Sequence, residues 1–136
     1  MAMEFDLIPQ GTLLKENGHG EAVSVTESTT RTFYCVLMIY EQIEQESLDV
    51  SIYGSADGAA WGAKPAAAFP QKFYRGESSL LLDLTAHPEV RVVRAHWEVA
   101  RWGRGVETPM FEFGVRLKEI PADVLRAATA EAKALA

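Results

Sequence analysis

Arg94, His96 and Glu98 alternate with apolar residues along one stretch of the chain. Successive side chains of a β-strand point to opposite faces, so these three are predicted to project from one face of a strand. Trp102 and Arg104 follow just beyond it. Arginine and tryptophan are enriched at binding hot spots, so the five residues predict a shallow patch for an anionic ligand, a glycan or a protein. The alternative is that they form the solvent face of a half-exposed sheet.

A second conspicuous group is Ser55, Asp57, Gly58 and Trp61, in the segment Ser-Ala-Asp-Gly-Ala-Ala-Trp. A sugar ring could stack on Trp61 while Asp57 accepts hydrogen bonds from its hydroxyl groups. Asp-Gly is also the pair that tight turns favour, and the Ser55 hydroxyl can hydrogen-bond the turn backbone. We therefore interpret the four residues as a structural turn and an aromatic anchor that closes the hairpin end over the core.

No catalytic or metal-binding arrangement is visible in the sequence. The three histidines, His19, His87 and His96, have none of the short spacings typical of metal ligands. The single cysteine, Cys35, lies in an apolar run and is expected to be a buried, inert thiol that forms no intrachain disulfide. Nucleophile motifs such as Gly-x-Ser-x-Gly are missing. We predict a protein that is not an enzyme and that carries no cofactor and no metal.

The composition narrows the class of protein further. The chain has 136 residues, the length of one domain, with 48% hydrophobic and 24% charged residues. Its net charge of −6 argues against nucleic-acid binding, which requires clustered basic residues. The first residues lack both the basic start and the long apolar run of a signal peptide, and no apolar stretch is long enough for a membrane span. We expect a cytoplasmic protein without membrane association.

Short apolar stretches separated by turn signals predict about eight β-strands. Thr32–Tyr40 is apolar at both alternating sets of positions, so we expect a central strand with both faces covered. The last two stretches flank a loop with two glycines and are predicted to form a hairpin or a neighbouring pair. The predicted strands are Phe5–Leu14, Ala22–Thr26, Thr32–Tyr40, Leu48–Tyr53, Phe69–Tyr74, Leu80–Leu84, Val93–Val99 and Met110–Leu117.

The end of the chain has a different pattern. From Pro121 onward it predicts a helix, with proline suited to the first turn and Asp123 favourable near the N-terminus. Its apolar stripe is mostly alanine and buries little area, so the helix must dock on the sandwich or on another subunit, or fray. The predicted fold is all-β, an antiparallel β-sandwich of jelly-roll type over residues 1–120, with a C-terminal α-helix appended over 121–136.

The segment Leu48–Trp61 resembles the strand and turn of discoidin domains, the coagulation-factor type C branch of the galactose-binding-like sandwiches. In that family an alternating strand precedes Ser-x-Asp-Gly-x-x-Trp, and a later strand carries aliphatic residues and an arginine, similar to Val90–Ala95 here. The resemblance spans Thr32–Leu117. It implies a jelly-roll module that binds a glycan or a protein through the loops at one end.

Two functions follow as expectations. The first is a non-catalytic binding module for a glycan or protein partner. The alternative is a structural or assembly subunit, such as a phage-particle or secretion-machine component or a homo-oligomer. This alternative is motivated by the doubly apolar strand Phe33–Tyr40 and by the exposed terminal helix, for which a partner subunit is one of the expected docking surfaces.

Overall fold

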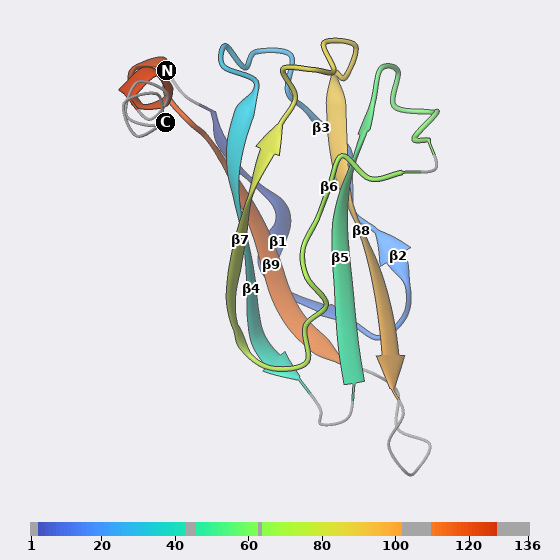
Figure 1. Cartoon of the computed structure of the whole chain (residues 1–136). Helices are drawn as coiled ribbons and strands as arrows, with labels where there is room; N and C mark the ends of the chain where they lie inside the picture. The colour runs from blue at the N-terminus through green and yellow to red at the C-terminus, as the bar shows by residue number, and fades with distance from the viewer. Residues whose placement is uncertain (1–2, 43–45, 63, 102–109, 128–136) are drawn as a thin grey trace.

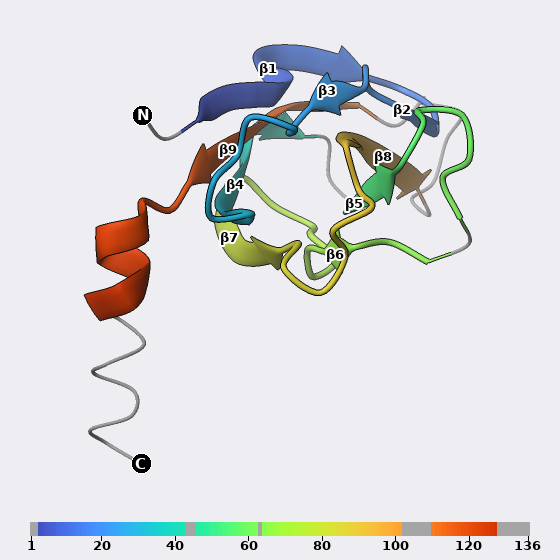
Figure 2. The same ribbon diagram turned by 90° about the horizontal axis from the view of Figure 1, so that it is seen from above.

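The computed structural model of the chain describes residues 3–42, 46–62, 64–101 and 110–127, and within them two antiparallel β-sheets pack face to face (Figure 1, Figure 2). Sheet A has the strand order β1-β9-β4-β7, and sheet B has the order β2-β8-β5-β6 with β3 also paired to β8. The strands are β1 (Glu4–Leu14), β2 (Gly18–His19), β3 (Val23–Ser24), β4 (Thr32–Gln42), β5 (Glu46–Ser55), β6 (Ala67–Ala68), β7 (Gly76–Asp83), β8 (Val92–Arg101) and β9 (Phe111–Glu119).

The pairing of these strands is nested along the chain. The first strand, β1, pairs with the last, β9, while β2 and β3 pair with β8, β4 with β7, and β5 with β6. Two further pairings, β4 with β9 and β5 with β8, complete the sheets. This nested order across two sheets is that of a jelly roll. The predicted all-β antiparallel sandwich is confirmed.

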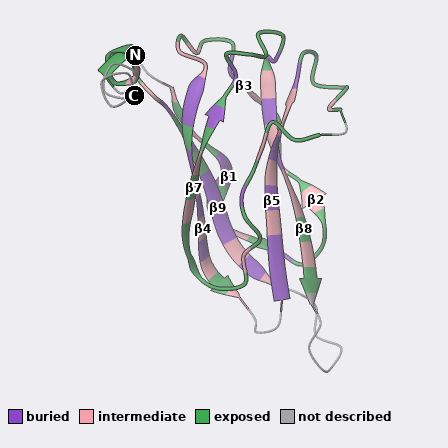
Figure 3. Ribbon diagram, viewed as in Figure 1, coloured by how far each residue is buried: buried purple, intermediate pink, exposed green. Residues whose placement is uncertain are grey.

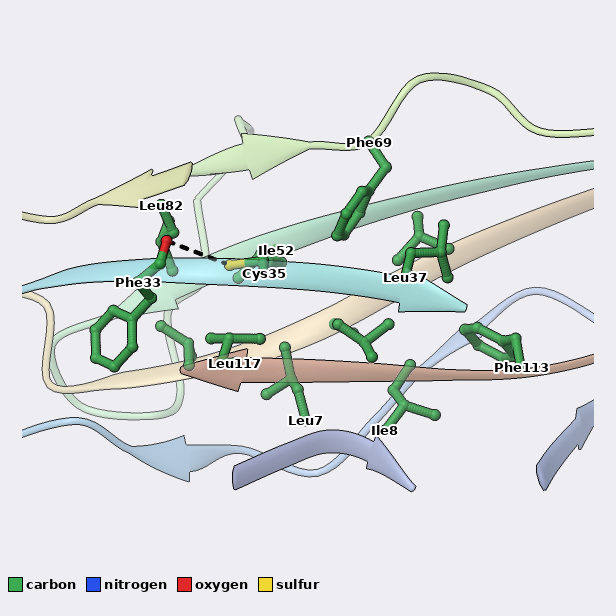
Figure 4. Packing of buried hydrophobic residues seen from close by; sticks show 14 of the residues in the cluster. Leu7, Ile8, Phe33, Cys35, Leu37, Ile52, Phe69, Leu82, Phe113 and Leu117 are labelled. Atoms are coloured by element: carbon green, nitrogen blue, oxygen red, sulfur yellow. Dashed lines mark hydrogen bonds between the residues drawn. The ribbon is translucent and has the colours of Figure 1, made fainter. Parts of the chain in front are cut away.

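One hydrophobic core lies between the sheets. It is built from the inward positions of the alternating strands, as the buried segments in Figure 3 and the close-up in Figure 4 show. Cys35 is among these residues, and burial raises the pKa of its thiol to about 12, so the thiol stays protonated and inert as expected. The core includes Leu7, Ile8, Phe33, Leu37, Ile39, Leu48, Val50, Ile52, Leu82, Val93, Ala95, Phe111, Phe113, Val115 and Leu117.

The prediction that the last two long strands form a hairpin or a neighbouring pair is wrong. β8 lies in sheet B beside β5, whereas β9 lies in sheet A between β1 and β4. Alternation shows that a segment is a strand, but any long alternating segment can pair with any other of matching length. The pattern of residues within a strand therefore did not indicate which other strand it pairs with.

β4 is central in sheet A, as predicted, but its outer face is not covered. Tyr34 is 43% exposed, and Val36, Met38 and Tyr40 are half-buried. In the part of the chain that the structure describes, only the neighbouring strands β7 and β9 flank this row. The apolar outer positions of β4 therefore form a strip on the surface of the sheet.

The C-terminal segment begins a helix at residues 122–127, opened by a hydrogen bond from Leu125 N to Pro121 O. The predicted helix is present in this stretch, and its remainder lies outside the described residues. Over the ranges that the structure describes, no helix combines the length and apolar character needed to cross a membrane.

Candidate functional site

β8 presents Arg94, His96 and Glu98 on the outer face of sheet B. Their neighbours Val93 and Ala95 are buried in the core, so the predicted alternation of the strand is confirmed. The face continues onto β5, because directly paired residues of antiparallel strands share a face. In this register Tyr53 is opposite Arg94, Ser51 is opposite His96 and Asp49 is opposite Glu98.

Trp61 lies on this face as well, although it was expected to close over the core. Its indole ring lies under the guanidinium of Arg94, with Cζ 4.2 Å from the ring centroid, which is cation–π geometry. The chain makes a turn at Asp57 and Gly58, but β5 and β6 first pair at Ile52 and Ala67, followed by Ser51 and Ala68. The long loop between them carries Trp61 to the outside of sheet B. It belongs to the end of the sandwich where the β3–β4 and β7–β8 loops also lie (Figure 1).

The guanidinium of Arg94 has no protein anion beside it. Among the described residues it forms no ion pair and no hydrogen bond, and its Nε is buried without a partner. Nη1 and Nη2 are not enclosed in the same way, so the forked end of the side chain reaches the surface. An arginine that is held by an aromatic ring and has both terminal nitrogens free can donate two parallel hydrogen bonds to an oxyanion.

The remaining side chains of the face contact one another. Tyr53 and His96 meet edge to face, with ring centroids 5.8 Å apart and an interplanar angle of 85°. His96 Nε2 lies 3.7 Å from Glu98 Oε1. We call Tyr53, Trp61, Arg94, His96 and Glu98 the Arg94 face.

A hydrogen-bonded pair, Asp49 and Gln71, and a histidine, His19, border the Arg94 face. Asp49 Oδ2 accepts a hydrogen bond of 3.0 Å from Gln71 Nε2 and lies opposite Glu98 in the β5–β8 register. On the other side, His19 of β2 is paired with His96 of β8. The described residues nevertheless contain no group of three or more histidine, cysteine, aspartate or glutamate side chains that could hold a metal ion.

Ser55, Asp57 and Gly58 have the geometry of a turn. The Ser55 hydroxyl accepts a hydrogen bond from Gly58 N at 2.9 Å, and Asp57 Oδ1 accepts from Ala59 N at 2.8 Å and Ala60 N at 3.0 Å. Gly58 has a φ of 80°, which glycine adopts without strain. The backbone amides of Ala60 and Ala59, with the Ser55 hydroxyl, lower the pKa of Asp57. All of these acceptors are used inside the loop, as the structural interpretation expects.

Two of the predicted binding residues, Trp102 and Arg104, lie outside the described residues. Two residues of the Arg94 face were not predicted as binding residues. Tyr53 was predicted only as the last residue of the strand Leu48–Tyr53, and its alternation with Ile52 was the available signal. Trp61 was assigned to the scaffold, and no local pattern places it beside an arginine 33 positions later in the chain, at 94.

Comparison of the chain with protein-family models, with curated proteins and with solved structures finds no match.

Proposed function

We propose that this chain is a non-catalytic binding module with a discoidin-like jelly-roll fold, and that it recognises a glycan or protein partner through the Arg94 face. The observation that carries the proposal is the guanidinium of Arg94, stacked on Trp61 with no anionic partner among the described residues. Trp61 comes from a loop at one end of the sandwich, which is where the family resemblance implies that ligands are bound.

Preorganisation supports this proposal. A long arginine side chain normally loses rotamer entropy when it binds a ligand, and contact with a ring limits that loss before the ligand arrives. Tyr53 and His96 extend the aromatic surface next to it. Aromatic rings and arginine are enriched at binding hot spots.

The test is capture of partners from a glycan array and from cell extract by the wild-type chain and by two variants. Arg94→Gln removes the guanidinium of the Arg94 face, and Arg91→Gln removes an exposed guanidinium three positions earlier. Both variants change the net charge equally. We expect Arg94→Gln to lose the captured ligand and Arg91→Gln to retain it. Empty captures at high concentration of the wild-type chain, or equal losses in both variants, would contradict the proposal.

A second candidate function is an assembly subunit, and the outer face of sheet A favours it. Tyr34 of β4 and Leu81 of β7 are directly paired there and are 43% and 60% exposed. Apolar side chains in adjacent positions on a sheet are a common feature of surfaces that bind another protein chain.

Sedimentation velocity at increasing concentration tests this second candidate. We expect the wild-type chain to form an oligomer and Leu81→Glu to remain a monomer, because burying an unpaired carboxylate beside Tyr34 costs free energy. Tyr74→Glu is the control, since Tyr74 is 73% exposed in the loop before β7. A wild-type chain that sediments as a monomer throughout would exclude self-assembly.

A further inference from the structure

We infer that the ligand of the Arg94 face is a saccharide that carries one carboxylate next to its hydroxyl groups. This inference rests on the proposed binding function and names its ligand class. The carboxylate would bind at the two terminal nitrogens of Arg94, and the hydroxyl groups would face the row of polar side chains that continues along β8 and β5.

The guanidinium of Arg94 has the geometry to bind a carboxylate. The planar fork of an arginine matches the two oxygens of a carboxylate, and it binds them most tightly where the arginine is already held in place. Here Trp61 covers one side of the guanidinium at 4.2 Å, and Nε is buried. The free Nη1 and Nη2 are therefore directed to a ligand at the surface rather than to the protein.

The rest of the Arg94 face offers polar groups to the ligand. Glu98 lies four positions after Arg94 on the antiparallel strand, a distance of about 13 Å, and His96 lies midway between them. Ser51 lies opposite His96, and Asp49 lies opposite Glu98. These side chains offer carboxylate, hydroxyl and imidazole groups, which are acceptors and donors for ligand hydroxyl groups.

The charges around the Arg94 face limit the number of negative charges on the ligand. Asp49 and Glu98 are directly opposed on the same face, and the chain carries a net charge of −6. A ligand with several adjacent negative charges, such as an acidic peptide, would be repelled by these two carboxylates. A neutral ligand would leave the fork of Arg94 without a partner. A single carboxylate flanked by hydroxyl groups can pair with Arg94 at one end of the face and donate hydrogen bonds to Asp49 and Glu98 at the other.

The test is a calorimetric titration of the full chain with defined ligands in matched pairs. Sialyllactose is paired with its methyl ester, and galacturonic acid is paired with its methyl ester, so that the members of each pair differ only in the charge of a single carboxylate. Hexaglutamate represents an acidic peptide. We expect at least one acidic saccharide to bind, with its neutral partner at least tenfold weaker.

Substitutions assign that binding to the face. Arg94→Gln is expected to lower the affinity for the acidic saccharide by about 10- to 100-fold, the usual effect of losing hydrogen bonds between charged groups. Arg94→Lys should retain only part of the affinity, because an ammonium lacks the fork. Arg91→Gln should bind as the wild type does. Circular dichroism and thermal unfolding of each variant establish that it is folded.

Three results would overturn the inference. If acidic and neutral saccharides bind equally and Arg94→Gln leaves their binding unchanged, the ligand does not need a carboxylate. If hexaglutamate binds more tightly than the saccharides, the ligand is an acidic peptide and not a saccharide. Both results leave the proposed binding module in place. Binding of none of the saccharides would reject the ligand class, and the capture experiment with Arg94→Gln and Arg91→Gln then decides separately whether the module binds a partner.

Discussion

At the scale of single residues, Glu119 joins three segments that are far apart in the sequence. Its side chain is 2% exposed at the end of β9. Oε1 accepts a hydrogen bond from Met3 N, and Oε2 accepts from the Ser28 hydroxyl, Thr29 N and Thr30 N. Burial by itself would raise the pKa of this carboxyl, but the hydrogen bonds outweigh it and lower the pKa to about 2.

Glu119→Gln is expected to lower the free energy of unfolding by about 2 kcal/mol at pH 7, the usual range for hydrogen bonds to a charged group. The effect depends on pH. Because the pKa is about 2 in the folded chain and ordinarily 4.5, the unfolded chain binds more protons between these values. The stabilisation is therefore complete above about pH 5 and is lost as the pH falls toward about 2. Urea unfolding of both chains between pH 7 and pH 2 measures this convergence.

Glu27→Gln is the control for this prediction, since it changes an exposed glutamate in the same loop. It should leave the pH dependence of unfolding unaltered. A constant difference between Glu119→Gln and the wild type at every pH would show that the carboxylate charge is not what stabilises this end of the sandwich.

Arg31 combines an unfavourable backbone with favourable side-chain contacts. Its φ of 58° lies in the left-handed region, and its Nη2 donates to His87 O and Val90 O, both at 2.8 Å. Arg31→Ala and Arg31→Gly lose the same hydrogen bonds, but only glycine relieves the backbone strain. We expect Arg31→Ala to be the less stable of the two by about 1 kcal/mol in thermal or urea unfolding. Equal stability would contradict the strained backbone.

At the scale of elements, the sandwich depends on close contacts between strands and loops. A Cβ at Gly54 of β5 would lie 2.8 Å from Val90 Cγ1 in the β7–β8 loop. Val90 is β-branched and buried, so it cannot move aside freely. Gly54 therefore allows the loop to pack against β5 next to the first residues of β8.

Gly54→Ala is expected to destabilise the fold by about 1–3 kcal/mol through overpacking. Val90→Ala should destabilise the fold by leaving a small cavity. The double variant should lose less free energy of unfolding than the two single variants lose together, because the smaller side chain at position 90 removes the clash. A double-mutant cycle in urea measures the coupling. Additive effects would mean that Gly54 is not retained for this contact.

Elements also show what alternation can predict. Arg94, His96 and Glu98 were placed on one face from their spacing alone, and the structure confirms it. Phe69–Tyr74 was predicted as a strand, whereas the assigned strand is β6 (Ala67–Ala68), and the chain then follows β5 through single contacts such as Phe69 N to Val50 O. Pro70 has no amide to donate, which shortens a strand that composition alone would extend.

At the scale of the whole molecule, the first strand, β1, and the last, β9, pair with each other at one side of sheet A. The described part of the segment that follows, from Pro121, is mostly exposed. Residues 121–124, 126 and 127 are exposed, with Val124 at 51%. A chain ending at Ile120 is therefore expected to unfold cooperatively with nearly the stability of the full chain, as the predicted division into 1–120 and 121–136 implies. Urea unfolding followed by fluorescence checks this. Loss of cooperative unfolding would make the terminal segment part of the core unit.

The sequence by itself determined the fold class, most of the strands and the faces of their residues. These properties are local, because a period of two in apolar residues specifies both a strand and its buried side. The turn at Ser55, Asp57 and Gly58 was predictable for the same reason, since its hydrogen bonds stay within six residues, from Ser55 to Ala60.

Only the tertiary structure decided which strands pair and which side chains meet. The contact of Trp61 with Arg94 depends on the path of a long loop over sheet B, and the bonds of Glu119 to Ser28 span 91 positions in the chain. Such contacts form because the strands bury their apolar faces together, and a polar side chain is carried to wherever that packing places it. For this reason the alternating positions of β8 could be predicted, whereas the tryptophan that completes the Arg94 face could not.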